Sequence, residues 1–356
     1  MTQKAWLEKL TYFQEEHALE IVLVFAFLSV AMLPGMARVE TIVALENMMP
    51  SSSTPVEGVN DLRAQGLGKD TVAVQITAGV HEDGVKSVND QRTQEYIRGL
   101  SDRINDVEGI TNVLTPLRRE GLVDERKQNA VMIAYTFSGD SGPEMERIFN
   151  DIEEEIGYER PEGIKTELSG VPAVQQRLSD MVNRDKNVTT MISLFLVFLI
   201  TLGLFQGSFS SALMPLIVVG LSVVWLYGTM GYLGIPLSTL AGSVAALVIG
   251  IGIDYSVHIL NTYRFHRRDN TIGEALSEAV GETGVAIVAT SITTISAFMA
   301  FLAGKMPEMH RFGLIMSLGI AYALLFSFFL LPSVFVLEEK IMKKIHDSID
   351  WRHDFP

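Results

Sequence analysis

Residues 235–262 read IPLSTLAGSVAALVIGIGIDYSVHILNT, and Asp254 is the one formally charged side chain in this long apolar stretch. A helix of about 20 apolar residues crosses the roughly 30 Å of hydrocarbon in a bilayer, so the stretch predicts a membrane-spanning helix. A carboxylate near the middle of such a helix costs on the order of 2.5–3.5 kcal/mol on insertion scales. Asp254 is therefore a candidate functional residue, and we expect it to be a neutral, protonatable acid.

Five further stretches have the composition of membrane spans and contain no Asp, Glu, Lys or Arg except Glu20: residues 18–36, 188–206, 212–233, 284–304 and 312–337. The residues before the first of them include Glu8, Glu15 and Glu16, which a signal peptide would rarely contain. We therefore expect the first span to be retained. The sequence predicts a bundle of six transmembrane helices.

Basic residues predict how the spans are oriented. They gather before the first span, after the fourth and after the sixth, as Lys4, Lys9, Arg264, Arg267, Arg268, Lys340, Lys343 and Lys344. If the spans alternate, all of these residues lie on one side, and an excess of Lys and Arg in short loops marks the cytoplasmic side. We therefore predict a multi-pass protein of the cell membrane with both termini in the cytoplasm.

The segments at this cytoplasmic side are assigned from their patterns. Residues 1–17 place apolar side chains on one helical face, which predicts an interfacial helix; a helical extension of the first span is the alternative. Residues 263–283 are expected to form a cytoplasmic loop with an amphipathic helix. Residues 338–356 are the predicted cytoplasmic tail.

The segment 37–187 is the predicted extracytoplasmic domain. It begins with a linker at Pro50–Pro55, where Pro and Ser dominate. After the linker, alternating and helical patterns predict the element order β-α-β-β-α-β, which is the ferredoxin-like pattern. The predicted fold class is therefore a membrane α-helical bundle with an inserted α+β ferredoxin-like domain.

Composition excludes several classes of protein. The net charge is −14 and no basic stripe is present, which argues against a nucleic acid partner. The chain contains no cysteine, so disulfides and thiolate metal sites are excluded. We predict no metal site, no cofactor and no enzymatic activity.

Small residues in the fourth span predict which face of the helix carries Asp254. Gly242, Ala246 and Gly250 recur every four residues, and Asp254 and His258 continue the same spacing. A four-residue step drifts only about 40° on a helix of 3.6 residues per turn, so neighbouring members share a face. Small residues let helix backbones approach closely. These three residues and Gly252 are the predicted helix-packing positions. The alternative interpretation is that the glycines serve ordinary helix packing only and have no part in a functional site.

Polar neighbours extend the candidate site to a proton relay. Tyr255 follows Asp254 directly, and His258 lies one turn closer to the cytoplasm; a histidine that only reaches the inner surface is the alternative. In the fifth span the candidates are the hydroxyls of Thr290, Thr293 and Thr294. Such hydroxyls often bond only to the carbonyl of the preceding turn, and this interpretation stays open.

The run Gly250–Tyr255 resembles the Gly-x-Gly-x-Asp-Tyr element of the resistance–nodulation–division (RND) superfamily. The branch it is most similar to contains the MMPL proteins, which export hydrophobic and lipid-like compounds. Three further elements are similar to the family pattern: Thr290–Thr294 followed by Phe298, Phe312-Gly313 through Leu331-Pro332, and Ser169–Pro172 at the entry to the second span. The layout of one span, an external domain and five spans also matches one family repeat.

The resemblance also has departures. Family members usually carry two such repeats in one chain, whereas this sequence has one, and Ala297 stands where the family commonly has glycine. In the family, the two fourth spans face each other across a pseudo-two-fold axis. The resemblance therefore implies a homodimer, or a pair with a second half-size RND chain.

The resemblance implies a proton-driven exporter of hydrophobic or amphiphilic compounds that acts in contact with membrane lipids. An intramembrane aspartyl protease is a second class, but it needs two carboxyls that share a proton, and the stretch around Asp254 supplies one. A third class is a non-transporting protein that senses lipids or assists protein export. The sequence names neither the cargo nor the coupling ion, which is a proton or sodium.

Overall fold

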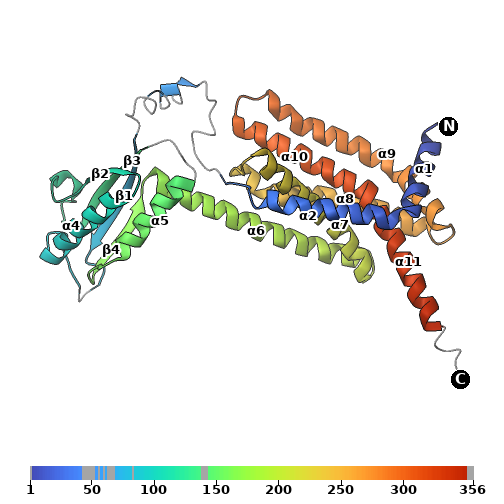
Figure 1. Ribbon diagram of the computed structural model, residues 1–356, viewed down its shortest axis with the longest axis horizontal. Coiled ribbons are helices and arrows are strands. Elements are labelled where there is room, and N and C mark those ends of the chain that lie inside the picture. The colour runs from blue at the N-terminus through green and yellow to red at the C-terminus, as the bar shows by residue number, and fades with distance from the viewer. Residues whose placement is uncertain are drawn as a thin grey trace. The chain divides into compact units, whose positions relative to one another are not determined.

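The computed structural model describes residues 2–41, 53–54, 57–58, 61, 69–81, 84–137 and 143–350. Most of the predicted linker at Pro50–Pro55 lies outside these residues. The chain divides into two compact units, one formed by Met1–Thr41 with Val182–Pro356 and the other by Ile42–Met181. Each unit is described by itself (Figure 1).

The first unit is a bundle of helices. Six stretches are long and apolar enough to span a membrane: Ala18–Met36, Ala173–Leu204, Phe209–Leu233, Leu240–His266, Ile272–Ala303 and Pro307–Lys344. The helices that form them are α2 (Ala18–Met36), α6 (Val171–Leu204), α7 (Phe209–Leu233), α8 (Val244–His266), α9 (Ile272–Met299), α10 (Pro307–Leu325) and α11 (Leu331–Asp350). Short 3₁₀ turns, η3 (Leu240–Ser243) and η4 (Ala300–Ala303), precede α8 and follow α9.

Local chemistry fixes where several of these helices begin and end. The side chains of Thr271 and Glu274 bond reciprocally to backbone N–H groups and form a capping box at the start of α9. This cap lies inside the predicted cytoplasmic loop, so the loop helix and the fifth span form one continuous helix. Gly234 ends α7 with φ of 64°, a left-handed conformation that glycine adopts without strain.

Close helix contacts and an aromatic cluster hold the bundle together. A Cβ on Gly228 of α7 would lie 2.6 Å from the Met32 Cβ of α2, so only glycine fits there. Trp225 of α7 packs edge-on against Phe326, at 5.0 Å between ring centroids, and donates a hydrogen bond of 2.9 Å to Ser29 Oγ. The buried indole N–H therefore has its partner.

A π-helical segment, η5 (Phe326–Leu330), separates α10 from α11. Such segments interrupt the regular ladder of backbone hydrogen bonds. The Phe328 carbonyl accepts a hydrogen bond of 2.8 Å from the side-chain amide of Gln14, which is almost fully buried. Gln14 belongs to α1 (Thr2–Glu16), the predicted interfacial helix, which packs against α9 and α11.

The second unit is an α+β layer structure. Strands β1 (Lys69–Ala78), β2 (Ile110–Leu114), β3 (Asn129–Phe137) and β4 (Ile164–Ser169) form an antiparallel sheet in the order β2-β3-β1-β4. Helices α4 (Gln91–Asp106) and α5 (Pro143–Gly157) follow β1 and β3, so the order along the chain is β-α-β-β-α-β. Buried aliphatic side chains of strands and helices, including Ile76, Ile97 and Met132, form its core.

Candidate functional site

One face of α8 is open on the protomer. Gly250, Asp254 and His258, at successive turns, are all exposed. Among the residues that the structure describes, no atom of a neighbouring element lies within 4 Å of the position that a Cβ on Gly250 would occupy. The polar residues of the predicted stripe thus lie on an uncovered surface of a membrane span, where a carboxylate is costly.

The other predicted packing residues lie against helices of the same chain. A Cβ on Gly242 would lie 3.1 Å from Val182 Cγ1 of α6. Gly252 points to the opposite side of α8, where a Cβ would lie 2.8 Å from the Ala323 Cβ of α10. Ala246 is half-buried. The predicted packing positions therefore divide: Gly242 of η3 and Gly252 of α8 contact helices of the same protomer, whereas Gly250 lies on the open face.

Tyr255 turns from the open face into the contact between α8 and α9. It is 6% exposed, and the fully buried Ser291 of α9 lies beside its hydroxyl. Among the described residues, Ser291 Oγ has no hydrogen-bond partner of good geometry. Asp254 and Tyr255 therefore face different environments although they are adjacent in sequence.

The three predicted threonines of α9 bond to their own helix. Thr290 donates to the Ala286 carbonyl at 3.0 Å, and Thr293 and Thr294 both donate to the Thr290 carbonyl at 2.8 Å. These are the local bonds that the sequence left open as the simpler interpretation. Thr290 and Thr293 are exposed and Thr294 is half-buried, so the oxygen lone pairs of the first two remain accessible from outside the protomer.

The structure adds polar residues that the sequence patterns did not single out. Ser256 of α8 and Ser327 of η5 are fully buried and share a hydrogen bond of 2.8 Å. Glu308 of α10 is 4% exposed and accepts from the Leu240 backbone N–H at 3.3 Å. Ser256 is visible in the sequence as the residue after Tyr255, but its partner depends on the π-helical segment, which no local pattern predicted.

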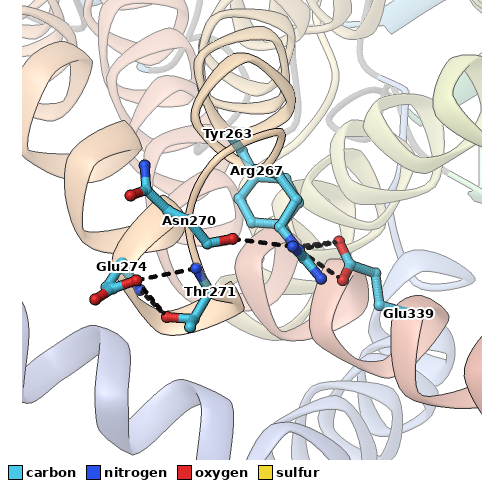
Figure 2. A network of polar contacts seen from close by, with 6 residues as sticks. All are labelled: Tyr263, Arg267, Asn270, Thr271, Glu274 and Glu339. Carbon is cyan, nitrogen blue, oxygen red and sulfur yellow. Dashed lines mark hydrogen bonds and ion pairs between the residues drawn. The ribbon is translucent and has the colours of Figure 1, made fainter.

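A polar network ties the end of α8 to α11 (Figure 2). Arg267 Nε lies 2.9 Å from Glu339 Oε2, and the Tyr263 hydroxyl donates to Glu339 Oε1 at 2.6 Å. Tyr263 also stacks on Phe335 of α11 at 5.1 Å between centroids. These contacts fix the last turns of α8 and leave the Asp254 face free.

Within the part of the chain that the structure describes, no three His, Asp or Glu side chains gather as they would around a metal ion. The chemistry of the α8 and α9 surface is therefore that of a carboxyl, an imidazole and hydroxyls. Such groups exchange protons and bind small cations.

The sequence model of the MMPL family matches residues 49–352. A protein of Methanocaldococcus jannaschii that is named as a membrane protein is 28% identical over 94% of each chain. MmpL12 of Mycobacterium tuberculosis, named as a probable transport protein, is 24% identical over 75% of this chain and 24% of its own length. The crystal structure of a heavy metal efflux pump superposes with a TM-score of 0.60 at 13% identity, covering 91% of this chain and 47% of that chain.

Six apolar helices, an acid in the fourth of them and an inserted α+β unit define a multi-pass membrane protein of the transporter class. The chain belongs to the MMPL family of the RND superfamily, because the family model matches far more than half of it. The predicted resemblance is thus confirmed. This is a family of transporters, not of enzymes. The chain spans almost the whole archaeal relative but about half of the pump's chain.

Proposed function

We propose that the protein is a proton-driven exporter of hydrophobic or amphiphilic compounds, with Asp254 as the group that takes up and releases the proton. The observation that carries this proposal is the exposed position of Asp254 on the open face of α8. Among the described residues, no Lys, Arg or His forms an ion pair with Asp254. The membrane potential can supply energy for moving a charge to and from such a carboxyl. That potential is worth about 2.3 kcal/mol per charge per 100 mV.

The exporter acts as a dimer of half-size chains, in which the open faces of α8 lie together. Covering this face removes Asp254 from lipid, and the empty space beside Gly250 lets a second backbone approach closely. A two-fold interface brings the same patch of both protomers together. A homodimer and a pair with a second half-size RND chain satisfy this requirement equally.

The second unit serves as the external porter domain. Its β-α-β-β-α-β order and the strand order β2-β3-β1-β4 support a ferredoxin-like assignment. The distribution of Lys and Arg supports cytoplasmic termini in the cell membrane, which places this unit outside. An aspartyl protease would need a second carboxyl beside Asp254. Within one chain, the buried carboxyl of Glu308 does not meet this need, because Glu308 contacts Leu240, 14 residues before Asp254, which is about 20 Å along a helix.

The proposal is tested with the purified chain in proteoliposomes that contain a pH-sensitive dye. An imposed pH gradient should be dissipated faster when the amphiphile rhodamine 6G is added, and Asp254→Asn should abolish this acceleration. Asp269→Asn is the matched control, since Asp269 is an exposed acid just beyond the end of α8. Acceleration at the unaltered rate in Asp254→Asn would contradict proton coupling through this residue.

A further inference from the structure

A cavity of about 550 Å³ lies at the C-terminal end of α8, where its lining begins with Asn261, three residues after His258. The end of α6, the last turns of α8 and one residue of α9 line it, with Phe205, Gln206, Asn261, Arg264, Arg268 and Glu282. Its volume is within the range of about 300–1,000 Å³ that is usual for ligand sites. All of these residues belong to the first unit.

The cavity has an excess of positive charge. In the described part of the chain, no carboxylate lies within 4.0 Å of the Arg264 or Arg268 guanidinium. Arg267, which lies between them in sequence, is instead paired with Glu339 and points to α11 (Figure 2). The lining contains one acid, Glu282, whose Oε2 lies 3.1 Å from His266 Nε2. Two guanidinium groups therefore face the cavity against one carboxylate.

The two arginines are arranged to hold one anion. Arg264 lies in the last turn of α8 and Arg268 in the turn that follows the helix, and both line the same cavity. The Arg264 guanidinium is held over the Phe205 ring at 5.6 Å from its centroid, which orients it before any ligand binds. Planar guanidinium groups match the oxygens of a phosphate with two parallel hydrogen bonds.

The surroundings of the cavity are those of a membrane interface. Leu204 and Phe265, which also line it, are 61% and 66% exposed and lie at the ends of two membrane spans. A ligand with its anionic part between the arginines would therefore place its apolar part along exposed apolar side chains. Basic pockets between transmembrane helices bind the headgroups of anionic lipids in this way.

We propose that Arg264 and Arg268, with the amides of Gln206 and Asn261, form a binding site for the phosphodiester headgroup of an anionic membrane phospholipid. The site does not depend on Asp254 or on proton coupling. A bound lipid would add to the Arg264–Phe205 contact that already joins the end of α8 to the corner after α6.

The site is tested by native mass spectrometry of the full chain with phosphatidylglycerol and phosphatidylcholine as probes. The unaltered chain should bind phosphatidylglycerol preferentially. The double variant Arg264→Gln/Arg268→Gln should bind it about thirtyfold more weakly, given the usual contribution of each basic residue near a membrane surface. Lys343→Gln is the matched control, because Lys343 is an exposed cation on α11 outside the cavity; its affinity should be unchanged.

Two further arms keep the proposal falsifiable. Arg264→Lys/Arg268→Lys retains the charge but not the planar guanidinium groups, and it should keep part of the affinity for phosphatidylglycerol. This variant provides the test if the glutamine variant fails to fold. Asp254→Asn should bind phosphatidylglycerol normally, which separates this site from the proposed transport mechanism. Equal affinity in the unaltered chain and both double variants would overturn the site. Displacement of the lipid by an equal concentration of inorganic phosphate would overturn the assignment to a lipid.

Discussion

At the scale of single residues, two glycines of α8 that are two positions apart have opposite environments. Gly252 is in contact with Ala323, whereas no described residue of a neighbouring element lies beside Gly250. We expect Gly252→Leu to destabilise the protomer by about 1–3 kcal/mol, as overpacking does, and to lower its thermal midpoint. Gly250→Leu should leave that midpoint unchanged. It should instead abolish the proton flux that rhodamine 6G stimulates, because the added side chain fills the proposed interface.

Thermal unfolding of the two variants in detergent, together with proton flux in proteoliposomes, separates these effects. Each variant serves as the control for the other, since both add the same side chain to the same helix. A Gly250→Leu protein that transports normally would show that the open face of α8 is not a contact with a second chain.

A second prediction at this scale concerns Asp124, in the turn before β3. Hydrogen bonds from the Asn129 and Gln128 backbone N–H groups and from the Asn129 amide hold the pKa of Asp124 below its usual range. A carboxyl whose pKa is lower in the folded than in the unfolded protein stabilises the folded state at pH values above its unfolded-state pKa. This contribution is lost as the pH falls through the folded-state pKa. Amide exchange at residues 128 and 129 should therefore be faster in Asp124→Asn than in the unaltered chain at pH 6.

This difference should shrink once the pH falls below the usual range of an aspartate pKa, because Asp124 itself becomes protonated only there. Hydrogen exchange with mass spectrometry on the full chain measures it directly. Glu125→Gln is a suitable control, since this neighbouring acid makes none of those three bonds. A difference that is independent of pH would contradict the assignment to the ionised carboxylate.

At the scale of elements, a hydrogen bond from the Gln14 side chain attaches α1 to the π-helical segment. Gln14→Met keeps the size of the side chain but leaves the Phe328 carbonyl without its donor. An unsatisfied buried carbonyl costs about 1–3 kcal/mol, so the thermal midpoint should fall. Tyr12→Leu, at an exposed position of the same helix, should have little effect. An unchanged midpoint in Gln14→Met would mean that the Gln14–Phe328 hydrogen bond does not contribute to holding α1.

The elements also show what a single sequence can predict. The six spans and the strand–helix order could be predicted because hydropathy and periodicity are properties of consecutive residues. The π-helical segment and the Ser256–Ser327 pair could not, because they depend on a register between helices distant in the chain. Within the site, spacing placed Gly250, Asp254 and His258 on one face. It could not predict that Tyr255 and Ser291 meet in the interior, because that requires the position of α9.

At the scale of the whole molecule, the chain offers a direct test of the proposed dimer because it contains no cysteine. Leu247→Cys places one thiol on the open face of α8, at a position that is 43% exposed. If the α8 faces meet about a two-fold axis, mild oxidation should produce a disulfide-linked dimer in membranes. Ile217→Cys on α7, at 49% exposure, should remain monomeric. Equal cross-linking at both positions would indicate random collision.

The open face of α8 also has a genetic consequence. If each working unit needs an acid from both chains, a cell that makes equal amounts of Asp254→Asn and unaltered chains forms intact pairs by random assortment in only about a quarter of its dimers. The altered copy would then act as a dominant inhibitor, and its dose would set the loss of activity. Selection would therefore act on pairs of chains. An inactive allele would lower the activity even in a cell that also carries a functional allele.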